Sequence, residues 1–101
     1  MSVKSSRFIS FEGGEGVGKT TQIERLKRHL VSLQHEVLIT REPGGTEIGE
    51  AIRQVLLDKT LPGMHQDTEL LLMFAARAEH VQTVIYPALA NGVWVLSDRF
   101  A

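Results

Sequence analysis

The chain has 101 residues, of which 43% are hydrophobic and 23% are charged, and it contains no cysteine. These fractions are typical of a globular domain and exclude a disordered tail, a collagen-like repeat and a small disulfide scaffold. The formal net charge of -1 predicts no nucleic-acid partner, and because the chain has neither a membrane-length apolar run nor a signal-peptide pattern, we expect a cytoplasmic protein without a membrane partner.

Three short segments rich in strand-forming residues are flanked by glycine or proline, which predicts three β-strands. They comprise residues 7–12, 37–40 and 93–97. All three are continuous apolar runs rather than strictly alternating ones. This pattern is typical of parallel strands that helices cover on both faces.

Between these strands, apolar residues recur at the spacing of a helical face. The pattern predicts a helix over 19–33, a second one with Thr46 as its N-cap, and a third capped by Asp67 or Thr68. The apolar face of the third helix comprises Leu71, Phe74, Ala78, Val81 and Ile85. Pro87 interrupts this face and either kinks the helix or starts a short new one. The order β-α-β-α-α-β predicts an α/β fold whose ligands bind at the carboxyl ends of the strands.

One glycine-rich segment matches the pattern G-x-x-x-x-G-K-[ST] without a mismatch and stands between a predicted strand and a predicted helix. Its glycines let backbone N–H groups turn toward phosphate oxygens, and the helix N-terminus adds its positive dipole. We expect Lys19 to reach the β- and γ-phosphates and the Thr20 hydroxyl to bind Mg²⁺. The predicted nucleotide-binding residues are Gly13, Gly14, Glu15, Gly16, Val17, Gly18, Lys19, Thr20 and Thr21. The loop alone does not distinguish a kinase from a GTPase, an ATPase motor or a transporter subunit.

Charged residues follow the other two predicted strands, at the same edge of the sheet. After the second strand, Glu42 and Pro43 either contact a second substrate or form an ordinary turn. After the third, Asp98 suits a carboxylate that binds Mg²⁺ and Arg99 suits a phosphate ligand, the alternative being an exposed charged pair. Glu15 is unusual in a loop that binds phosphate, so it either points toward hydroxyl groups or is exposed.

Further candidates lie on the predicted helices. Arg53 and Arg77 are either ligands or surface arginines, and Phe74 is either a core residue or a stacking platform. The histidines have no metal-binding spacing, and we expect all of them to be structural or surface residues. They are His29, His35, His65 and His80.

Four motifs, in this order and spacing, closely resemble those of bacterial thymidylate kinases. They are Phe11–Thr21, Thr40–Thr46, Leu71–Arg77 with Glu79, His80 and Pro87–Leu89, and Val95–Phe100. The resemblance covers residues 7–100 and implies the P-loop nucleoside-monophosphate kinase fold. It also implies transfer of the γ-phosphoryl group of ATP to dTMP, giving dTDP and ADP for dTTP synthesis, with Mg²⁺ as cofactor and a homodimer as the assembly. The alternatives are another P-loop nucleoside-monophosphate kinase and a non-catalytic nucleotide-binding fragment.

By the same resemblance, Lys19, Asp98 and Arg99 would be catalytic, and Thr20 and Asp98 would hold the metal ion. The family has a five-stranded sheet and a longer chain. We therefore expect residues 1–101 to be the N-terminal part of a single P-loop kinase domain, with three of the five strands present and the lid and C-terminal part absent. On this view the chain alone would be inactive.

The resemblance also implies an acceptor site, which would comprise Glu15, Glu42, Pro43, Arg53, Phe74, Arg77 and Arg99. Glu15 would bind the 3'-hydroxyl of the acceptor sugar. Arg53 and Arg99 would hold the acceptor phosphate, and Arg77 would hydrogen-bond the thymine ring. Phe74 would stack on the base, although many relatives have the stacking aromatic at the position that Met73 occupies here.

Overall fold

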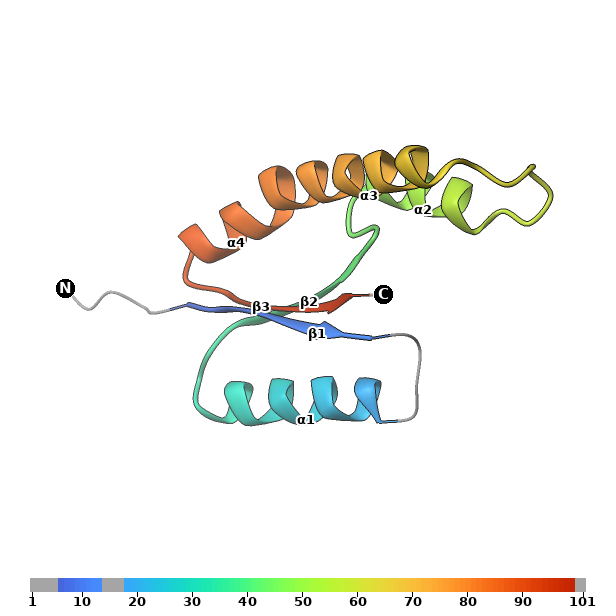
Figure 1. Ribbon diagram of the computed structural model, residues 1–101. Helices are drawn as coiled ribbons and strands as arrows, with labels where there is room; N and C mark the ends of the chain where they lie inside the picture. The colour runs from blue at the N-terminus through green and yellow to red at the C-terminus, as the bar shows by residue number, and fades with distance from the viewer. Residues whose placement is uncertain (1–5, 14–17, 100–101) are drawn as a thin grey trace.

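The computed structural model describes residues 6–13 and 18–99, and a parallel sheet lies at its centre (Figure 1). In these residues the sheet has three strands in the spatial order β1-β3-β2, so that β3 is central. The strands are β1 (Phe8–Glu12), β2 (Val37–Glu42) and β3 (Trp94–Arg99). The predicted parallel sheet is confirmed.

β2 and β3 extend two residues beyond their predicted carboxyl ends. The parallel pairing continues through Arg41 opposite Asp98 and Glu42 opposite Arg99. The sequence prediction ended the strands where the apolar run stopped, but backbone pairing does not require apolar side chains. The candidate charges are therefore the last residues of strands rather than loop residues, and strand geometry determines their orientation.

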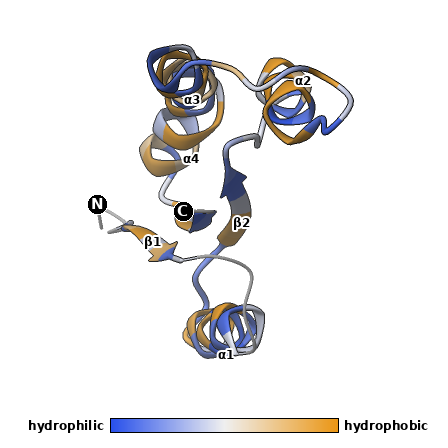
Figure 2. Ribbon diagram, turned by 45° about the vertical axis from the view of Figure 1, so that its right-hand side comes forward, coloured by the Kyte–Doolittle hydropathy of each residue, from blue (hydrophilic) through white to orange (hydrophobic). Residues whose placement is uncertain are grey.

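Helices cover both faces of the sheet. In the described ranges these are α1 (Lys19–Ser32), α2 (Glu47–Leu57), α3 (Gln66–His80) and α4 (Tyr86–Ala90). α1 lies alone on one face, whereas α2, α3 and α4 lie on the other (Figure 2). This three-layer arrangement confirms the predicted α/β architecture. In residues 6–13 and 18–99, no helix combines the length and apolar character needed to cross a bilayer.

The two predicted helix caps have different outcomes. The Thr46 hydroxyl accepts a hydrogen bond of 2.8 Å from the backbone N–H of Gly49, so Thr46 caps α2 as predicted. The predicted cap of α3 by Asp67 or Thr68 is wrong, because His65 occupies the N-cap position without a side-chain hydrogen bond to the helix. Asp67 instead lies in the first turn of α3, where its negative charge favours the positive end of the helix dipole.

Pro87 marks the start of a short new helix, which is one of the two predicted alternatives. After α3 the chain makes a single π-helical turn, η1 (Val81–Ile85), and Pro87 then stands near the start of α4. Proline is tolerated at the first turn of a helix because its missing N–H would have no partner there.

The core lies between α1 and the sheet. Its buried residues are Ile23, Leu30 and Leu96, and Ile9, Phe11, Leu26, Val37, Ile39 and Trp94 pack against them. The apolar stripe predicted for the third helix is only partly buried: Ile85 is 5% exposed, whereas Leu71 is 67% and Phe74 54% exposed. The fully buried positions of α3 are instead Ala76 and His80. The face of α3 that approaches the sheet is thus partly polar.

Candidate functional site

The two faces of the sheet differ in chemistry. Because side chains alternate along a strand, residues in register on neighbouring parallel strands share a face. One row on the face toward α3 comprises Ser10, Ser97 and Thr40, and the next row comprises Glu12, Arg99 and Glu42. The face toward α1 carries the apolar core. The α3 side of the sheet therefore ends in a polar surface at the carboxyl ends of the strands.

Sequence reasoning missed this polar surface. The signal was present, since each strand contains a hydroxyl residue two positions before a charged one: Ser10 and Glu12, Thr40 and Glu42, Ser97 and Arg99. The repeated spacing indicates one shared face only when the register between the strands is known.

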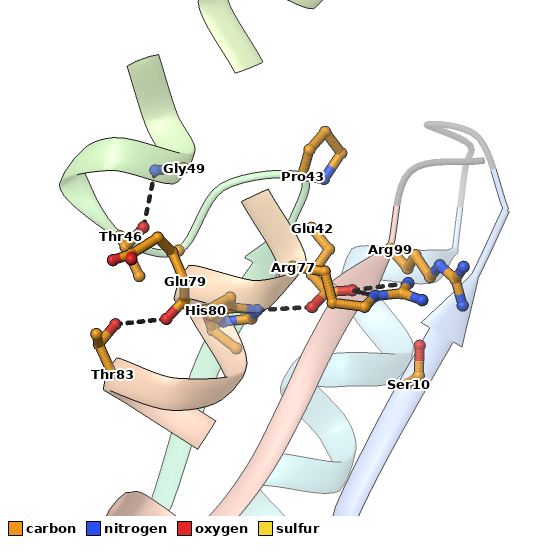
Figure 3. Close-up of polar contacts among 12 residues, drawn as sticks. Ser10, Glu42, Pro43, Thr46, Gly49, Arg77, Glu79, His80, Thr83 and Arg99 are labelled. Atoms are coloured by element: carbon orange, nitrogen blue, oxygen red, sulfur yellow. Dashed lines mark hydrogen bonds and ion pairs between the residues drawn. The ribbon is translucent and has the colours of Figure 1, made fainter. Parts of the chain in front are cut away.

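Glu42 is the centre of the polar surface. It is 7% exposed, and its Oε1 lies 2.9 Å from both Nε and Nη2 of Arg77. Its Oε2 lies 2.8 Å from Nδ1 of His80 (Figure 3). Burial acts to raise the pKa of Glu42, but the hydrogen bond from His80 and the charge and hydrogen bond of Arg77 together lower it below its usual value. Glu42 is therefore a carboxylate at neutral pH.

Two cavities meet at Glu42, Arg77 and Arg99. The smaller, of about 80 Å³, is lined by Glu42, Pro43, Leu70, Met73, Phe74, Arg77 and Arg99. The larger, of about 360 Å³, lies along β1 and is lined by Phe8, Ser10, Glu42, Arg77, Val81, Ile85, Tyr86, Leu89 and Arg99. The structure thus brings together five of the seven predicted acceptor residues. Met73 and Phe74 both line the smaller cavity, so both positions considered for the stacking residue face it.

Arg53 contacts the turn that borders this cavity. It is 8% exposed, and its Nη1 donates a hydrogen bond of 3.0 Å to the carbonyl oxygen of Pro43. Pro43 itself lines the smaller cavity. In the described part of the chain, Arg53 therefore supports the β2–α2 turn, and its guanidinium is one residue removed from the cavity.

On the other side of the sheet, Lys19 joins the glycine-rich segment to β3. Its Nζ lies 2.7 Å from the carbonyl oxygen of Gly13 and 2.6 Å from Oδ1 of Asp98. Gly13 and Gly18 have positive φ values of 123° and 101°, which glycine adopts without strain. Thr20 and Thr21 lie exposed in the first turn of α1. The predictions for Gly14, Glu15, Gly16 and Val17 lie outside the described residues.

The side chains of Asp98 and Arg99 point to opposite faces of the sheet because the two residues are consecutive in β3. Asp98 contacts Lys19 at the start of α1, whereas Arg99 lines both cavities under α3. Arg99 also donates a hydrogen bond of 3.1 Å to Glu12, and both of these side chains are exposed. One strand end therefore supplies a carboxylate to Lys19 on one side and a guanidinium to the cavities on the other.

Comparison with known proteins identifies the family. The family model described as thymidylate kinase matches residues 11–101. The chain belongs to the thymidylate kinase family. The resemblance inferred from the four motifs is thus confirmed.

Individual members of the thymidylate kinase family match over nearly the whole chain. A thymidylate kinase of Ruthia magnifica subsp. Calyptogena magnifica is 53% identical over 98 residues, which are 97% of this chain and 48% of that protein. One from Nitrosomonas europaea is 54% identical over 98 residues, 97% of this chain and 45% of the relative. The chain spans about half the length of these curated relatives.

A solved structure confirms the fold. The crystal structure of thymidylate kinase from Ehrlichia chaffeensis superimposes with a TM-score of 0.83 at 41% sequence identity, and the match covers 95% of this chain and 55% of that one. The predicted P-loop nucleoside-monophosphate kinase fold is therefore confirmed for this member of the thymidylate kinase family.

Proposed function

We propose that the protein containing this chain transfers the γ-phosphoryl group of ATP to dTMP, giving dTDP and ADP. The observation that carries the proposal is that the last two residues of β3, Asp98 and Arg99, point to opposite faces of the sheet. Asp98 extends toward the phosphate loop on one side, and Arg99 extends toward a cavity with a second arginine, Arg77, on the other. A phosphoryl transferase needs two such adjacent sites, one for the donor and one for the acceptor. Family membership supports the choice of donor and acceptor.

On the donor side, Lys19 would bind the β- and γ-phosphates, and the N-terminus of α1 would add its dipole. The oxygen ligands of Thr20 and Asp98 suit Mg²⁺, which is held by one or two protein groups together with substrate phosphates and water. When bound, Mg²⁺ would neutralise charge on the phosphates.

On the acceptor side, the cavity combines apolar walls with two guanidinium groups. Met73 and Phe74 offer surfaces for a flat base, and Arg77 offers hydrogen-bond donors at its edge. We propose that Arg99 binds the acceptor phosphate directly and that Glu15 binds the sugar 3'-hydroxyl. We propose that Arg53 also binds the acceptor phosphate. Its contact with Pro43 supports a second role, in which it holds the β2–α2 turn in place.

No covalent intermediate is needed in this proposal. Catalysis would come from positioning two nucleotides and neutralising the charge between them. Lys19 and Arg99 would be the cations nearest the transferred group, and Asp98 would keep Lys19 oriented before the donor binds. We further propose that residues 1–101 form the N-terminal part of a single kinase domain in a cytoplasmic homodimer. The exposed apolar side chains Ile48, Val55 and Leu71 on α2 and α3 support the dimer.

The test is acceptor preference. The full-length protein would be assayed with ATP and Mg²⁺ against dTMP, dUMP, dCMP and AMP, with release of ADP as the measurement. We expect dTMP to have the highest kcat/KM. A preference for AMP or dCMP would assign the protein to another nucleoside-monophosphate kinase class, and nucleotide binding without turnover would favour a non-catalytic role.

A further inference from the structure

A chain of hydrogen bonds runs from β2 through α3 to the cavity. Thr40 Oγ1 lies 2.6 Å from Nε2 of His80, and Nδ1 of His80 lies 2.8 Å from Oε2 of Glu42. Oε1 of Glu42 then accepts the hydrogen bond of Arg77. His80 has no exposed surface, whereas the Arg77 side chain is 35% exposed and lines both cavities. Within this series of hydrogen bonds, the buried residue His80 therefore supports the partly exposed residue Arg77.

The contact with Glu42 assigns the proton on Nδ1 of His80. The carboxylate of Glu42 only accepts hydrogen bonds, because its pKa is lowered and it carries no proton at neutral pH. Nδ1 of His80 must therefore donate to it. In the neutral ring, Nε2 then accepts a hydrogen bond from the hydroxyl of Thr40. All polar atoms of the His80 ring have a partner, as burial requires.

The order hydroxyl, imidazole, carboxylate is also that of a nucleophilic triad, but His80 is fully buried and Gly45 packs against its ring. A Cβ atom on Gly45 would lie 2.5 Å from Nε2 of His80 and 2.7 Å from Oγ1 of Thr40. The backbone of the β2–α2 turn thus packs closely against the His80 ring and the Thr40 hydroxyl. The hydrogen-bond chain is a buried support.

Arg77 needs such a support. Its long side chain has many rotamers, and ordering it costs conformational entropy. Arg99 lines the same cavities and carries the same charge. Glu42 offsets that charge, and because both of its oxygens are engaged it holds one rotamer. Figure 3 shows the Arg77 side chain extending from α3 toward the ends of β1 and β3, on the side of Ser10 and Arg99.

We propose that His80 is a positioning residue of the acceptor site, which acts on bound nucleotide through Glu42 and Arg77. The inference rests on the proposed function for the identity of the acceptor. It adds that the affinity for the acceptor depends on the Nδ1–H of His80, whereas the affinity for ATP does not. Outer residues of this kind orient the groups that touch a ligand without touching it themselves.

Two variants of the full-length protein separate this role from simple packing. His80→Asn keeps an amide donor near the position of Nδ1, so its hydrogen bond to Glu42 is retained. In His80→Gln, the longer side chain places its amide near Thr40, and the hydrogen bond to Glu42 is lost. We expect the KM for dTMP to rise about tenfold in His80→Gln, the size expected for loss of one hydrogen bond to a charged group, and less than about threefold in His80→Asn. The KM for ATP stays unchanged in both, and His65→Asn, at an exposed position, serves as the control.

A second readout does not depend on activity. In side-chain ¹H–¹⁵N spectra of the full-length protein, Nε–H of Arg77 gives a signal slowed in solvent exchange by Glu42, assigned by its loss in Arg77→Lys. We expect faster exchange in His80→Gln and near-wild-type exchange in His80→Asn. Equal effects of the two variants on exchange or on the KM for dTMP would overturn the role of His80. A wild-type protein that does not phosphorylate dTMP would instead overturn the proposed function, and the exchange measurement would still decide whether His80 positions Arg77.

Discussion

Lys19 and Asp98 form an ion pair with a distance of 2.6 Å between Nζ and Oδ1, although the two residues stand 79 positions apart along the chain. The pair joins the start of α1 to the end of the central strand. Because Lys19 also donates a hydrogen bond to the carbonyl oxygen of Gly13, two contacts hold its ammonium group between the glycine-rich segment and the end of β3.

Asp98→Asn tests the carboxylate in this pair. The amide keeps the size of the side chain but loses the charge that we propose holds Mg²⁺. We expect the Mg²⁺ concentration at half-maximal rate to rise about 10- to 100-fold, the usual cost of disturbing the support of a metal ion. The measurement is a Mg²⁺ titration of the initial rate at saturating ATP. An unchanged titration curve would remove Asp98 from the proposed metal site.

Glu15→Ala and Lys19→Ala should separate the acceptor side from the donor side. We expect Glu15→Ala to raise the KM for dTMP and leave ATP binding intact, whereas Lys19→Ala weakens ATP binding. The matched control is dTMP without its 3'-hydroxyl, for which wild type and Glu15→Ala should differ little. Equal losses toward both substrates in Glu15→Ala would contradict its proposed contact with the sugar.

Thr46→Ala and Thr68→Ala compare a real helix cap with one that only the sequence predicted. Thr46 caps α2 through Gly49, so its loss should lower the free energy of unfolding by about 1 kcal/mol. Thr68 lies exposed inside α3, and its replacement should change that free energy by less than about 0.5 kcal/mol. Urea unfolding followed by circular dichroism measures both. A larger loss in Thr68→Ala would contradict the observed start of α3.

Gly45→Ala should be strongly destabilising, and Gly63→Ala should not. Gly45 has a φ of 83°, and its Cβ would collide with the His80 ring. We expect a loss of about 2 kcal/mol or more, since left-handed strain alone costs about 1–3 kcal/mol. Gly63 has open space at the Cβ position, so alanine there should be neutral or slightly stabilising. Comparable unfolding midpoints for the two variants would show that the turn does not press on His80.

Glu50→Gln should change how the free energy of unfolding depends on pH in the acid range. The side chain and backbone hydrogen bonds from Arg41 and Gly45 lower the pKa of Glu50 to about 2, against 4.5 for an unperturbed glutamate. A carboxyl group with a lowered pKa in the folded state contributes stability above the unfolded value, and that contribution is lost as the pH falls from 4.5 to about 2.

We therefore expect wild type to exceed Glu50→Gln in stability at pH 7 and the difference to shrink by pH 2.5. The difference will be modest because solvent screens this half-exposed pair. Urea unfolding across this pH range measures it, with Glu47→Gln as the control at an exposed position of the same helix. A difference that does not vary with pH would contradict the role of Glu50.

Sequence analysis predicted the features that depend on local patterns. The glycine-rich segment, the parallel strands and the Thr46 cap all follow from residue types at short spacing. The gathering of Glu42 and Arg99 at one cavity also followed, because charges at strand ends share one edge of a parallel sheet. Arg77 was a candidate on its helix, but its partner Glu42 could not be recognised, since 35 residues separate them.

The features that sequence analysis missed depend on how segments distant in sequence pack together. His80 was correctly expected to be structural or exposed, but nothing in its spacing distinguished it from the exposed His29. Its burial follows from the approach of α3 to the hydroxyl row that contains Thr40. For the same reason the apolar residue Phe74 was grouped with buried positions, although the helix turns it toward a cavity.

The alternation of Asp98 and Arg99 makes the separation of the two proposed nucleotide sites a property of strand pairing. A slip of β3 by one residue against β1 and β2 would exchange the two charges, placing a carboxylate among the arginine-rich walls and a guanidinium beside Lys19. Insertions or deletions within this strand would therefore abolish both sites at once, whereas changes of length in the loop between α2 and α3 would leave them intact. The separation of the two proposed sites thus depends on the alternation of side chains along a single strand.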